Sequence, residues 1–442
     1  MVDRIEIKPV ERPIDAVVQI PGSKSITNRA LLLAALAGGT SRIEGALFSD
    51  DTRYMSDALN ALGIQVSGDE TSATYTVSGT GGKIPSHKAD LFLGNAGTAT
   101  RFLTAALALG QGEYRIDGVE RMRQRPIEDL LGALRQLGVD AESELGTGCP
   151  PVRIRTSGLP GGKAKLRGDA SSQYLSALLM VAPLSQNGAE VEIAGQLASK
   201  PYIGITLRMM QQWSAGLKYS ESGSAQPDSD GISFRYTVPA GHGYQSRTYR
   251  VEPDASTASY FFAAAAVTGG RVRVEGLGSG ALQGDLAFVD VLAQMGCEVE
   301  QTEDYTEVRG PAQLRGVDVD MNAISDTVMS LAAIAPFADG PTTIRNVGNI
   351  RLKETDRLHA VATELDRLGV ETKEWNDGIE ICPAQYLKPA DIQTYDDHRM
   401  AMSFAVTGLK APGVAILDPG CTAKTVPDFF TRFQSLYCNH GG

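Results

Sequence analysis

The chain has 442 residues, which exceeds the usual size of a single hydrophobic core and predicts two domains. Its hydrophobic content of 42% and charged content of 21% are ordinary for a globular protein, and its net charge of −11 argues against non-specific nucleic-acid binding, which requires broad basic surfaces. No apolar run approaches the length that crosses a membrane, and the N-terminus alternates like a strand instead of resembling a signal or transit peptide.

The cysteines are spaced in a way that excludes the common metal and redox motifs. No C-x-x-C pair and no zinc-type spacing with histidine occurs among Cys149, Cys297, Cys382, Cys421 and Cys438. An odd number of scattered cysteines favours free thiols in a reducing compartment. We therefore expect a cytoplasmic protein with no metal site.

Six times along the chain, a short polar loop precedes an Ala/Leu-rich helix, a Gly and an alternating strand. The loops recur roughly every seventy to eighty residues, at 21–25, 94–98, 168–172, 253–256, 324–327 and 395–399. A second helix of the form Leu-x-x-Leu-Gly and a further strand follow most of them, at 58–66, 130–139, 291–299 and 365–370. A fixed period with one supersecondary unit in each copy predicts a repeat architecture of α/β units.

The repeats divide naturally into two groups of three. The most polar stretch, 220–231, lies between the third and fourth repeats and is followed by Gly241-His242-Gly243. We therefore predict one domain at 22–241 and another made of 1–21 plus 242–442. The first strand, 4–8, has no helix of its own and is expected to pair with the C-terminal half. The chain would then cross twice, near Pro21 and Gly241, and form a hinge.

Ser, Thr and Asp before an apolar helix are usually N-caps. Three acids fit this role: Asp169, Asp254 and Asp396. Capping does not explain the cations of the first loop, because a positive charge in the first helical turn is unfavourable. Free N–H groups at a helix start bind anions, so Lys24, Ser25 and Arg29 predict an anion site.

The segment 351–357 is a second concentration of charge. If it is helical, Lys353 and Arg357 share a face, where like charges repel unless an anion lies between them. Glu354 adjoins them and is placed to donate or accept a proton. A solvated charged surface is the alternative interpretation.

Two shorter motifs, 125–127 and 199–202, place Pro at a predicted first helical position with a cation just outside it. Between Asp397 and Arg399, His398 is either catalytic or a structural hydrogen-bonding residue. The chain has no Walker-type phosphate loop, no dinucleotide-binding glycine motif and no H-E-x-x-H.

Taken together and in order, these motifs resemble the 5-enolpyruvylshikimate-3-phosphate (EPSP) synthase family over nearly the whole chain. The resemblance rests on 21–30, 93–99, 125–127, 171–173, 353–357 and 396–402. It implies an α/β fold of two domains arranged as an inside-out barrel. Each domain would contain three βαβαββ-type units, with helix N-termini facing the interdomain cleft.

The resemblance also implies the reaction and the residues that perform it. The reaction is enolpyruvyl transfer from phosphoenolpyruvate to the 5-hydroxyl of shikimate 3-phosphate, by addition and elimination, in aromatic amino-acid biosynthesis. The expected ligands of shikimate 3-phosphate are Lys24, Ser25, Arg29, Ser171, Ser172, Gln173, Ser199, Tyr202, Asp326, Asn349 and Lys353. Those of phosphoenolpyruvate are Lys24, Asn95, Gly97, Arg125, Gln173, Arg357, Arg399 and Lys424.

Asp326 and Glu354 are the expected proton-transferring groups, with Lys24 assisting. No metal or organic cofactor is implied, because the cations neutralise both anions. The family resemblance further implies a monomer whose partners are small anionic substrates, without nucleic acid or membrane, and an enzyme inhibited by glyphosate. The chain departs from the family pattern at Phe102, where many members have Pro, and this affects the expected shape of the phosphoenolpyruvate loop.

Three other functions remain open at this stage. A UDP-N-acetylglucosamine enolpyruvyl transferase shares the fold, but normally uses a cysteine in the second-repeat region, and 91–125 contains none. An RNA 3′-phosphate cyclase is disfavoured by the acidic charge balance and by the lack of a nucleotide-accepting His motif. A non-catalytic scaffold is possible because fold alone does not determine function, although the clustered cations and Glu354 argue against it.

Overall fold

The computed structural model describes residues 3–169, 171–214, 216–224 and 226–438. The chain divides into two compact units. Gly22–Val251 forms the first, called here the continuous unit, and 1–21 with 252–442 forms the second, called the split unit. Each unit is described by itself.

The second crossing of the chain lies later than the sequence indicated. We predicted it after Gly241, whereas it falls after Val251. Residues 242–251 stay with the continuous unit because β14 (Thr248–Arg250) pairs in parallel with β3 (Gly38–Glu44). The Gly38 N–H also donates to the Tyr244 carbonyl oxygen, so the segment before β14 follows the same edge.

The continuous unit contains three four-stranded sheets with one common strand order. They are β14-β3-β5-β4, β6-β7-β9-β8 and β10-β11-β13-β12. In each, the first two strands are parallel and the remaining neighbours antiparallel. Their further strands are β4 (Gln65–Asp69), β5 (Thr74–Thr80), β6 (Lys88–Phe92), β7 (Gln111–Asp117), β8 (Asp140–Ser143), β9 (Val152–Ser157), β10 (Gly162–Arg167), β11 (Ala189–Ala194), β12 (Ser220–Gly223) and β13 (Ile232–Val238).

The split unit repeats this order in β2-β15-β17-β16 and β18-β19-β21-β20, and has a three-stranded sheet β22-β23-β1. Its strands are β1 (Arg4–Glu6), β2 (Asp15–Val18), β15 (Arg271–Glu275), β16 (Glu298–Gln301), β17 (Tyr305–Arg309), β18 (Asp318–Asp320), β19 (Thr342–Arg345), β20 (Thr372–Trp375), β21 (Gly378–Ile381), β22 (Ala390–Ile392) and β23 (Val414–Leu417). The expected pairing of the first strand with the C-terminal half is confirmed, because β1 is antiparallel to β23.

Two strands explain why the chain crosses twice. β2 precedes the first helix of the continuous unit but pairs with β15, and β14 precedes the first long helix of the split unit but pairs with β3. Each unit thus receives the opening strand of the other unit's first repeat. A parallel partner must come from a distant part of the chain, and this pairing keeps β2 in the split unit and β14 in the continuous unit.

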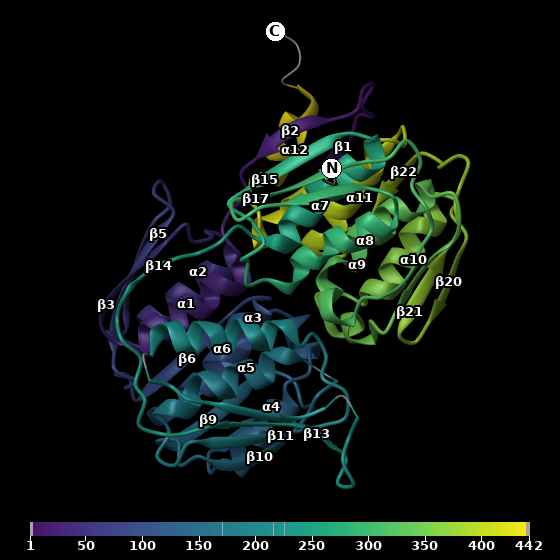
Figure 1. Cartoon of the computed structure of the whole chain (residues 1–442). Helices are drawn as coiled ribbons and strands as arrows, with labels where there is room; N and C mark the ends of the chain where they lie inside the picture. Colours follow the sequence, from purple (N-terminus) through teal and green to yellow (C-terminus); the bar gives the residue numbers. More distant parts are fainter. Residues whose placement is uncertain (1–2, 170, 215, 225, 439–442) are drawn as a thin grey trace. The chain divides into compact units, whose positions relative to one another are not determined.

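One helix in each repeat is buried on all sides. In the continuous unit these helices are α1 (Lys24–Leu36), α3 (Gly97–Leu107) and α5 (Ser172–Val181), and in the split unit α7 (Ala255–Thr268), α9 (Val328–Ile334) and α11 (His398–Gly408). Their sequences are mostly small and apolar, as expected of helices without a solvent face, and their arginine and lysine residues lie within the first two turns. Within each unit the sheets lie toward the periphery and these helices inside them (Figure 1).

The remaining helices expose a polar face. They are α2 (Asp50–Ala61), α4 (Glu128–Gln136), α6 (Pro201–Trp213), α8 (Phe288–Gln294), α10 (Arg357–Arg367) and α12 (Phe429–Cys438). Short 3₁₀ segments precede several helices. Four of these segments contain or adjoin predicted site residues: η1 (Met122–Gln124), η4 (Asn322–Thr327), η6 (Gly348–Leu352) and η7 (Pro419–Lys424).

Of the three predicted acidic N-caps, one is correct. Asp254 accepts a hydrogen bond from the Thr257 N–H at 2.7 Å and caps α7. The cap of α5 is Ser171, and Asp169 instead pairs with Arg167 on the surface. The cap of α11 is Asp397, because Asp396 has a left-handed backbone with φ of 54° whereas an N-cap requires an extended one.

Candidate active site

The first predicted anion site lies at the start of α1 in the continuous unit. Ser23 is its N-cap and accepts from the Ile26 N–H. Lys24 is the first helical residue, and its Nζ lies 3.4 Å from Oδ2 of Asp51 in α2. Both side chains are largely buried, at 12% and 4% exposure. A cation and a carboxylate therefore sit together at the positive end of this helix.

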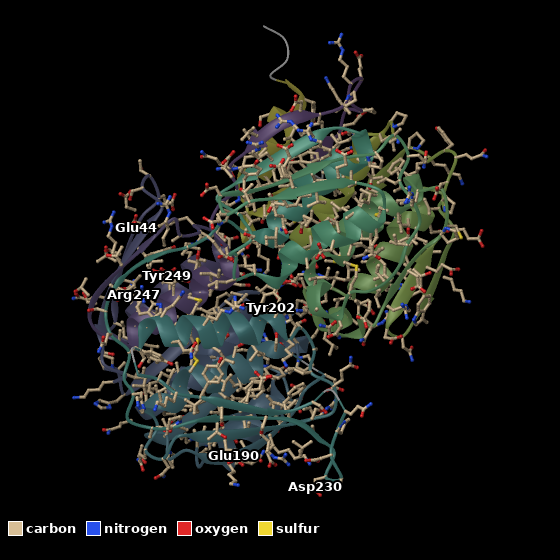
Figure 2. All side chains as sticks on the ribbon, viewed as in Figure 1. Glu44, Glu190, Tyr202, Asp230, Arg247 and Tyr249 are labelled. Carbon is tan, nitrogen blue, oxygen red and sulfur yellow. The ribbon has the colours of Figure 1, made fainter. Side chains whose placement is uncertain are left out.

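Arg29, one turn further along α1, is buried among neutral oxygens. Its Nε donates to Thr206 Oγ1 at 2.7 Å, and its Nη atoms donate to Ser176 Oγ and to the carbonyl oxygens of Ser25 and Tyr202. Burial lowers the pKa of Arg29 to about 10. The side chain thereby connects the first turns of α1 and α6 with α5. Tyr202 lies at the beginning of α6 (Figure 2).

Phe102, the departure from the family pattern, is completely buried in α3. Its ring centroid lies 5.1 Å from the Arg29 guanidinium carbon, within the range of a cation–π contact. The helix is continuous through this position from Gly97 to Leu107. Phe102 therefore packs beneath Arg29 and does not break the helix.

Three residues predicted to bind phosphoenolpyruvate come together before α3. The Arg125 Nη1 donates to the carbonyl oxygen of Asn95 at 3.1 Å and to its Oδ1 at 3.0 Å. A Cβ atom built on Gly97 would lie 2.5 Å from Arg125 Nη2, so a side chain at this position would displace the guanidinium. Arg125 is 4% exposed. The loop 94–97 and Arg125 are thus joined by hydrogen bonds.

The start of α5 contacts this loop through Gln173. Gln173 Nε2 donates to Thr98 Oγ1 at 3.1 Å, and the Ser171 hydroxyl accepts from the Gln173 N–H. The Ala198 N–H donates to the Gly168 carbonyl oxygen, which ties the loop before α6 to the loop before α5. Three serines predicted to bind shikimate 3-phosphate lie in or directly after these two loops: Ser171, Ser172 and Ser199.

Ser199 has an unusual backbone for a residue with a side chain. Its φ is 52°, in the left-handed region, and it is 4% exposed. Such a conformation costs energy for a non-glycine residue and is enriched at functional sites. It directly precedes Lys200 and Pro201, and α6 begins at Pro201 as the motif predicted.

In the split unit, Asp326 at the end of η4 is surrounded by cations. Its Oδ2 accepts from Arg399 Nη2 at 2.7 Å, and its Oδ1 lies 3.3 Å from Arg357 Nη1 and 3.8 Å from Lys353 Nζ. Arg399 also donates to the Asp326 carbonyl oxygen. Asp326 retains 16% exposure of its side chain, which leaves it accessible as well as paired.

Glu354 occupies the next position in the same cluster. Its Oε2 accepts from Arg357 Nη2 at 2.7 Å, and its Oε1 lies 3.9 Å from Lys424 Nζ. Arg357 is 1% exposed and donates from Nε to Oδ2 of Asp397 at 2.7 Å. Burial opposes the charged form of Arg357, but the nearby Asp397, Glu354 and Asp326 outweigh it and raise the arginine pKa.

Asn349 adjoins this cluster from η6. Its Nδ2 donates to Ser325 Oγ at 3.3 Å, one residue before Asp326. Asn349, Lys353, Glu354, Arg357, Arg399 and Lys424 thus all lie around the Asp326 region of the split unit. These residues come from four separate segments of the chain.

Two local expectations were wrong. Lys353 and Arg357 do not share a helix, because α10 begins at Arg357 with Asp356 as its N-cap and Lys353 follows η6 in a non-helical conformation. They meet through Asp326 instead. Pro126 is not the first residue of α4, which begins at Glu128, because its carbonyl oxygen is directed to other partners.

The sequence reasoning missed several supporting residues. Asp51, Ser176, Thr206 and Asp397 each contact a predicted cation. Asp397 was part of a motif but received no role beyond its neighbourhood to His398, which lies 3.6 Å from it through Nδ1. No local signal distinguishes these residues from ordinary caps and helix positions, because their partners are distant in the sequence.

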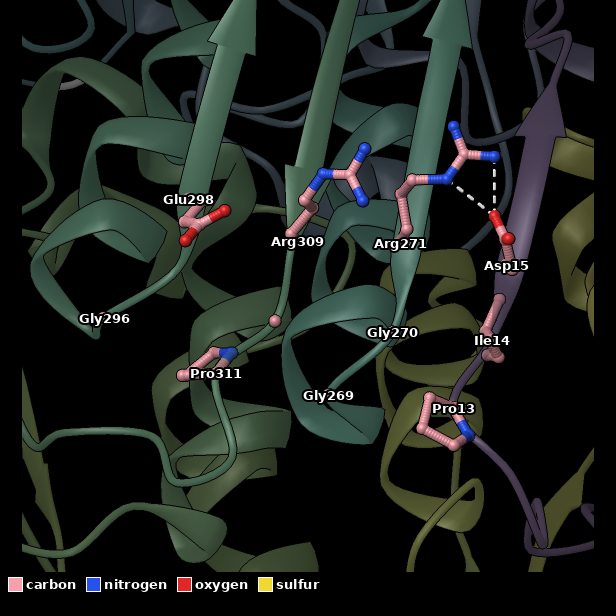
Figure 3. Close-up of a pocket in the computed structure, with 11 residues that line it drawn as sticks. Pro13, Ile14, Asp15, Gly269, Gly270, Arg271, Gly296, Glu298, Arg309 and Pro311 are labelled. Carbon is pink, nitrogen blue, oxygen red and sulfur yellow. Dashed lines mark hydrogen bonds and ion pairs between the residues drawn. The ribbon is translucent and has the colours of Figure 1, made fainter.

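An open pocket of about 520 Å³ in the split unit lies apart from these motifs (Figure 3). It is lined by the ends of β2, β15, β16 and β17, and none of the predicted site residues borders it. Arg271 in its wall is paired with Asp15 and Glu307. The charged groups that line it therefore stabilise the sheet surface.

Within 3–169, 171–214, 216–224 and 226–438, no group of three or more His, Cys, Asp and Glu side chains is arranged to hold a metal ion. In the same ranges, no helix is both long enough and apolar enough to span a membrane. Four cysteines of the described part are free thiols, as expected: Cys149, Cys297, Cys382 and Cys421. The side chain of Cys438 lies outside the described part.

Comparisons with known proteins agree over almost the whole chain. Residues 9–433 match the family model described as EPSP synthase (3-phosphoshikimate 1-carboxyvinyltransferase). A 3-phosphoshikimate 1-carboxyvinyltransferase of Nostoc punctiforme is 53% identical over 98% of this chain and 99% of its own. The chloroplastic protein of that name from Brassica napus is 49% identical over 98% and 85%. The structure of an EPSP synthase from Acinetobacter baumannii superposes with a TM-score of 0.79 at 23% identity, over 98% of both chains.

Proposed function

The chain belongs to the EPSP synthase family. We propose that two charged clusters, one around Lys24, Arg29 and Arg125 in the continuous unit and one around Asp326 and Arg357 in the split unit, bind the two anionic substrates of that family's reaction. The reaction transfers the enolpyruvyl group of phosphoenolpyruvate to the 5-hydroxyl of shikimate 3-phosphate and releases phosphate. This transferase activity, in the shikimate pathway of aromatic amino-acid biosynthesis, is the activity of the chain. Transfer to UDP-N-acetylglucosamine is not favoured.

For phosphoenolpyruvate, we assign the phosphate to Lys24, Arg125, Lys424 and the Gly97 loop, and the carboxylate to Arg357 and Arg399. The observation that carries this assignment is the convergence of Asn95, Gly97 and Arg125 from two separate motifs. The arginine fork matches a carboxylate with two parallel hydrogen bonds, which supports the role of Arg357 and Arg399. Gln173 borders the phosphate loop through Thr98.

For shikimate 3-phosphate, we assign the phosphate to Ser171, Ser172 and Ser199, which belong to two tied loops at helix starts. Helix N-termini and hydroxyl groups are suited to phosphate. Ser25 and Arg29 would receive the carboxylate, Gln173 and Tyr202 the ring, and Lys24, Asp326, Asn349 and Lys353 the remaining oxygens. Arg29 already holds Ser25 and Tyr202 through their carbonyl oxygens, so it also positions their backbone.

The chemistry requires proton transfer at two positions. The 5-hydroxyl oxygen adds to C2 of phosphoenolpyruvate, the hydroxyl proton leaves, and C3 gains a proton. Phosphate then departs as C3 loses a proton, which restores the double bond in the product. We propose Asp326 and Glu354 as the carboxylates that move these protons, with Lys24 assisting. Each lies beside cations that stabilise its charged form, and neither role requires a metal or organic cofactor.

The complete set of ligands draws on both units, which supports the finer architecture implied by the family. We propose that the continuous and split units are the two domains of an inside-out α/β barrel, each with three βαβαββ-type units. Helix N-termini would face the cleft that binds substrate, and ligand binding would close the domains. Small-angle scattering with and without shikimate 3-phosphate tests this. An unchanged radius of gyration would contradict closure.

Glyphosate is the expected competitor of phosphoenolpyruvate, because its phosphonate and carboxylate match the same cations. A cytoplasmic location and a monomeric state, both expected from the sequence, stay predictions. The assay that tests the function is phosphate release from phosphoenolpyruvate with purified protein. We expect release with shikimate 3-phosphate and none with UDP-N-acetylglucosamine. Release with the nucleotide sugar alone would overturn the assignment.

A further inference from the structure

One backbone carbonyl group in the continuous unit receives two hydrogen bonds from side chains on different helices. The Pro126 carbonyl oxygen accepts from Arg101 Nη2 at 2.8 Å and from the Tyr174 hydroxyl at 2.5 Å. Arg101 belongs to α3 and Tyr174 to α5. Both donors are buried, at 4% and 3% exposure.

The location of this carbonyl group gives the two hydrogen bonds a functional meaning. Pro126 directly follows Arg125, so fixing its carbonyl fixes the backbone that carries the Arg125 side chain. The segment lies between η1, whose last hydrogen bond runs from the Arg125 N–H to the Met122 carbonyl oxygen, and α4, which begins at Glu128. The Pro126 carbonyl oxygen therefore belongs to no helical hydrogen-bond ladder, and the two side chains satisfy it instead.

Arg101 has a second set of contacts that extends the connection. Its Nη1 lies 3.4 Å from the Gly97 carbonyl oxygen and 3.3 Å from Met122 Sδ. One guanidinium thus touches the first turn of α3, η1 and the residue after Arg125. On the other side, Tyr174 follows Gln173, whose amide reaches Thr98. The loops at 94–98, 122–126 and 171–174 form one hydrogen-bonded assembly.

We propose that Arg101 and Tyr174 are positioning residues that act through the Pro126 carbonyl oxygen to hold Arg125 against Asn95 and Gly97. This inference rests on the proposed assignment of Arg125 to phosphoenolpyruvate. Neither residue is assigned to substrate itself. Their effect is to pre-organise a phosphate cradle, because a side chain held in its binding geometry loses less conformational freedom when the ligand arrives.

The Tyr174→Phe variant tests the inference directly, because it removes only the hydroxyl and retains the packed ring. We expect the KM for phosphoenolpyruvate to rise about two- to tenfold, the range for a neutral hydrogen bond, with the KM for shikimate 3-phosphate unchanged. Tyr114→Phe is the matched control. Tyr114 is fully buried in the same unit, and its hydroxyl donates to the Ser86 carbonyl oxygen at 2.7 Å. It should change thermal stability alone.

Variants of Arg101 provide a second measurement, in which a conservative substitution is compared with a more disruptive one. Arg101→Lys keeps the charge but loses the planar fork, so it should raise the KM for phosphoenolpyruvate less than Arg101→Gln does. Thermal melting of all variants identifies any that are unfolded. If both substrates are affected equally by Tyr174→Phe, or if neither KM moves, the positioning role is wrong.

A double-mutant cycle separates this inference from the site assignment. If Tyr174 acts through Arg125, the effect of Tyr174→Phe on phosphoenolpyruvate should disappear in an Arg125→Ala background. An additive effect would overturn the inference while leaving the assignment of Arg125 intact. An Arg125→Ala variant with an unchanged KM for phosphoenolpyruvate would overturn both.

Discussion

The two charged clusters of this protein hold their cations in different ways. In the split unit, Arg357 and Arg399 are bound to the buried or nearly buried carboxylates Asp326, Glu354 and Asp397. In the continuous unit, Arg29 and Arg125 donate to carbonyl, hydroxyl and amide oxygens. The first arrangement brings acids that can exchange protons into the site. In the second, these two arginines have neutral partners, whereas Lys24 of the same unit pairs with Asp51.

This contrast suggests a division of work between the clusters. Phosphate is bound by charge-assisted hydrogen bonds from cations, whereas proton transfer requires carboxylates fixed at short distance. The continuous unit would then mainly supply phosphate binding, and the split unit the acid–base chemistry. Five experiments test how far this division holds.

The largest effect is expected at the proposed proton-transferring acids. Asp326→Asn and Glu354→Gln should each lower kcat by about 10²–10⁴, the usual range for general acid–base groups. The control is Asp254→Ala, which removes a cap in the same unit and should cost about 1 kcal/mol of stability with kcat nearly unchanged. Turnover and thermal melting are measured side by side. Near-normal kcat in both acid variants would leave Lys24 as the main proton carrier.

A buried ion pair in the charged cluster of the split unit should make the stability of the protein sensitive to substitution there. Asp397→Asn keeps an N-cap for α11 but removes the charge opposite Arg357, where both side chains are buried. Breaking such a pair from one side costs about 3 kcal/mol or more, because the remaining charge stays buried. Chemical denaturation would measure the loss. In the continuous unit, Asn95→Ala removes a neutral partner of Arg125 and should cost about 1 kcal/mol. Equal losses would contradict the contrast.

The two arginines of the continuous unit should separate the substrates. Arg125→Ala is expected to weaken the binding of phosphoenolpyruvate, and Arg29→Ala is expected to weaken the binding of shikimate 3-phosphate. A charge-assisted hydrogen bond contributes about 1.5–3 kcal/mol, so each variant should lose about ten- to a hundredfold on its own ligand. Titration calorimetry with each ligand measures this. Similar damage to both ligands in both variants would show that the assignment is wrong.

The continuous unit also contains a buried carboxylate that is not among the proposed phosphate ligands. Asp117 at the end of β7 accepts hydrogen bonds from Arg123 and Arg115 and from the Gly118 N–H. The Arg123 hydrogen bonds outweigh the effect of burial and lower the pKa of Asp117 to about 2 from an ordinary 3.8. The folded state therefore binds this proton less readily than the unfolded chain.

A depressed carboxyl pKa stabilises the folded state above the unfolded pKa and loses that contribution as pH falls through the folded pKa. Asp117→Asn should cost roughly 2 kcal/mol at pH 7, and the difference from the parent should shrink between about pH 4 and 2. Urea denaturation across this range measures it. A difference that persists unchanged at pH 2 would mean that the charge on Asp117 is not its source.

The smallest effect concerns inhibitor selectivity. A Cβ at position 97 would meet the Arg125 guanidinium at 2.5 Å and displace it. Gly97→Ala should therefore weaken glyphosate, the bulkier ligand, by several-fold more than it raises the KM for phosphoenolpyruvate. Inhibition curves at fixed phosphoenolpyruvate measure both. A variant as sensitive as the parent would place the inhibitor elsewhere.

The sequence by itself determined the repeat period, the motifs and hence the family and the reaction. These properties are local, because a cap, a glycine or an Ala/Leu helix is written in a few adjacent residues. The sequence also assigned the loops at 94–98 and 125–127 to the same ligand, and these loops meet through Arg125 in the structure. It misjudged elements whose form depends on distant partners, such as the non-helical segment before Arg357 and the boundary after Val251.

Only the tertiary structure decided which charges meet. Arg357 finds Asp397 forty positions along the chain, and Arg29 finds Thr206 at a separation of 177 residues. Asp356 and Asp397 look alike in sequence and both cap a helix, yet Asp356 pairs with Arg351 at the surface whereas Asp397 is buried against Arg357. The reason is physical, because pairing of buried charges is selected by the packing of whole helices. The exchange of β2 and β14 between the units depends equally on edges that exist only after each sheet has formed.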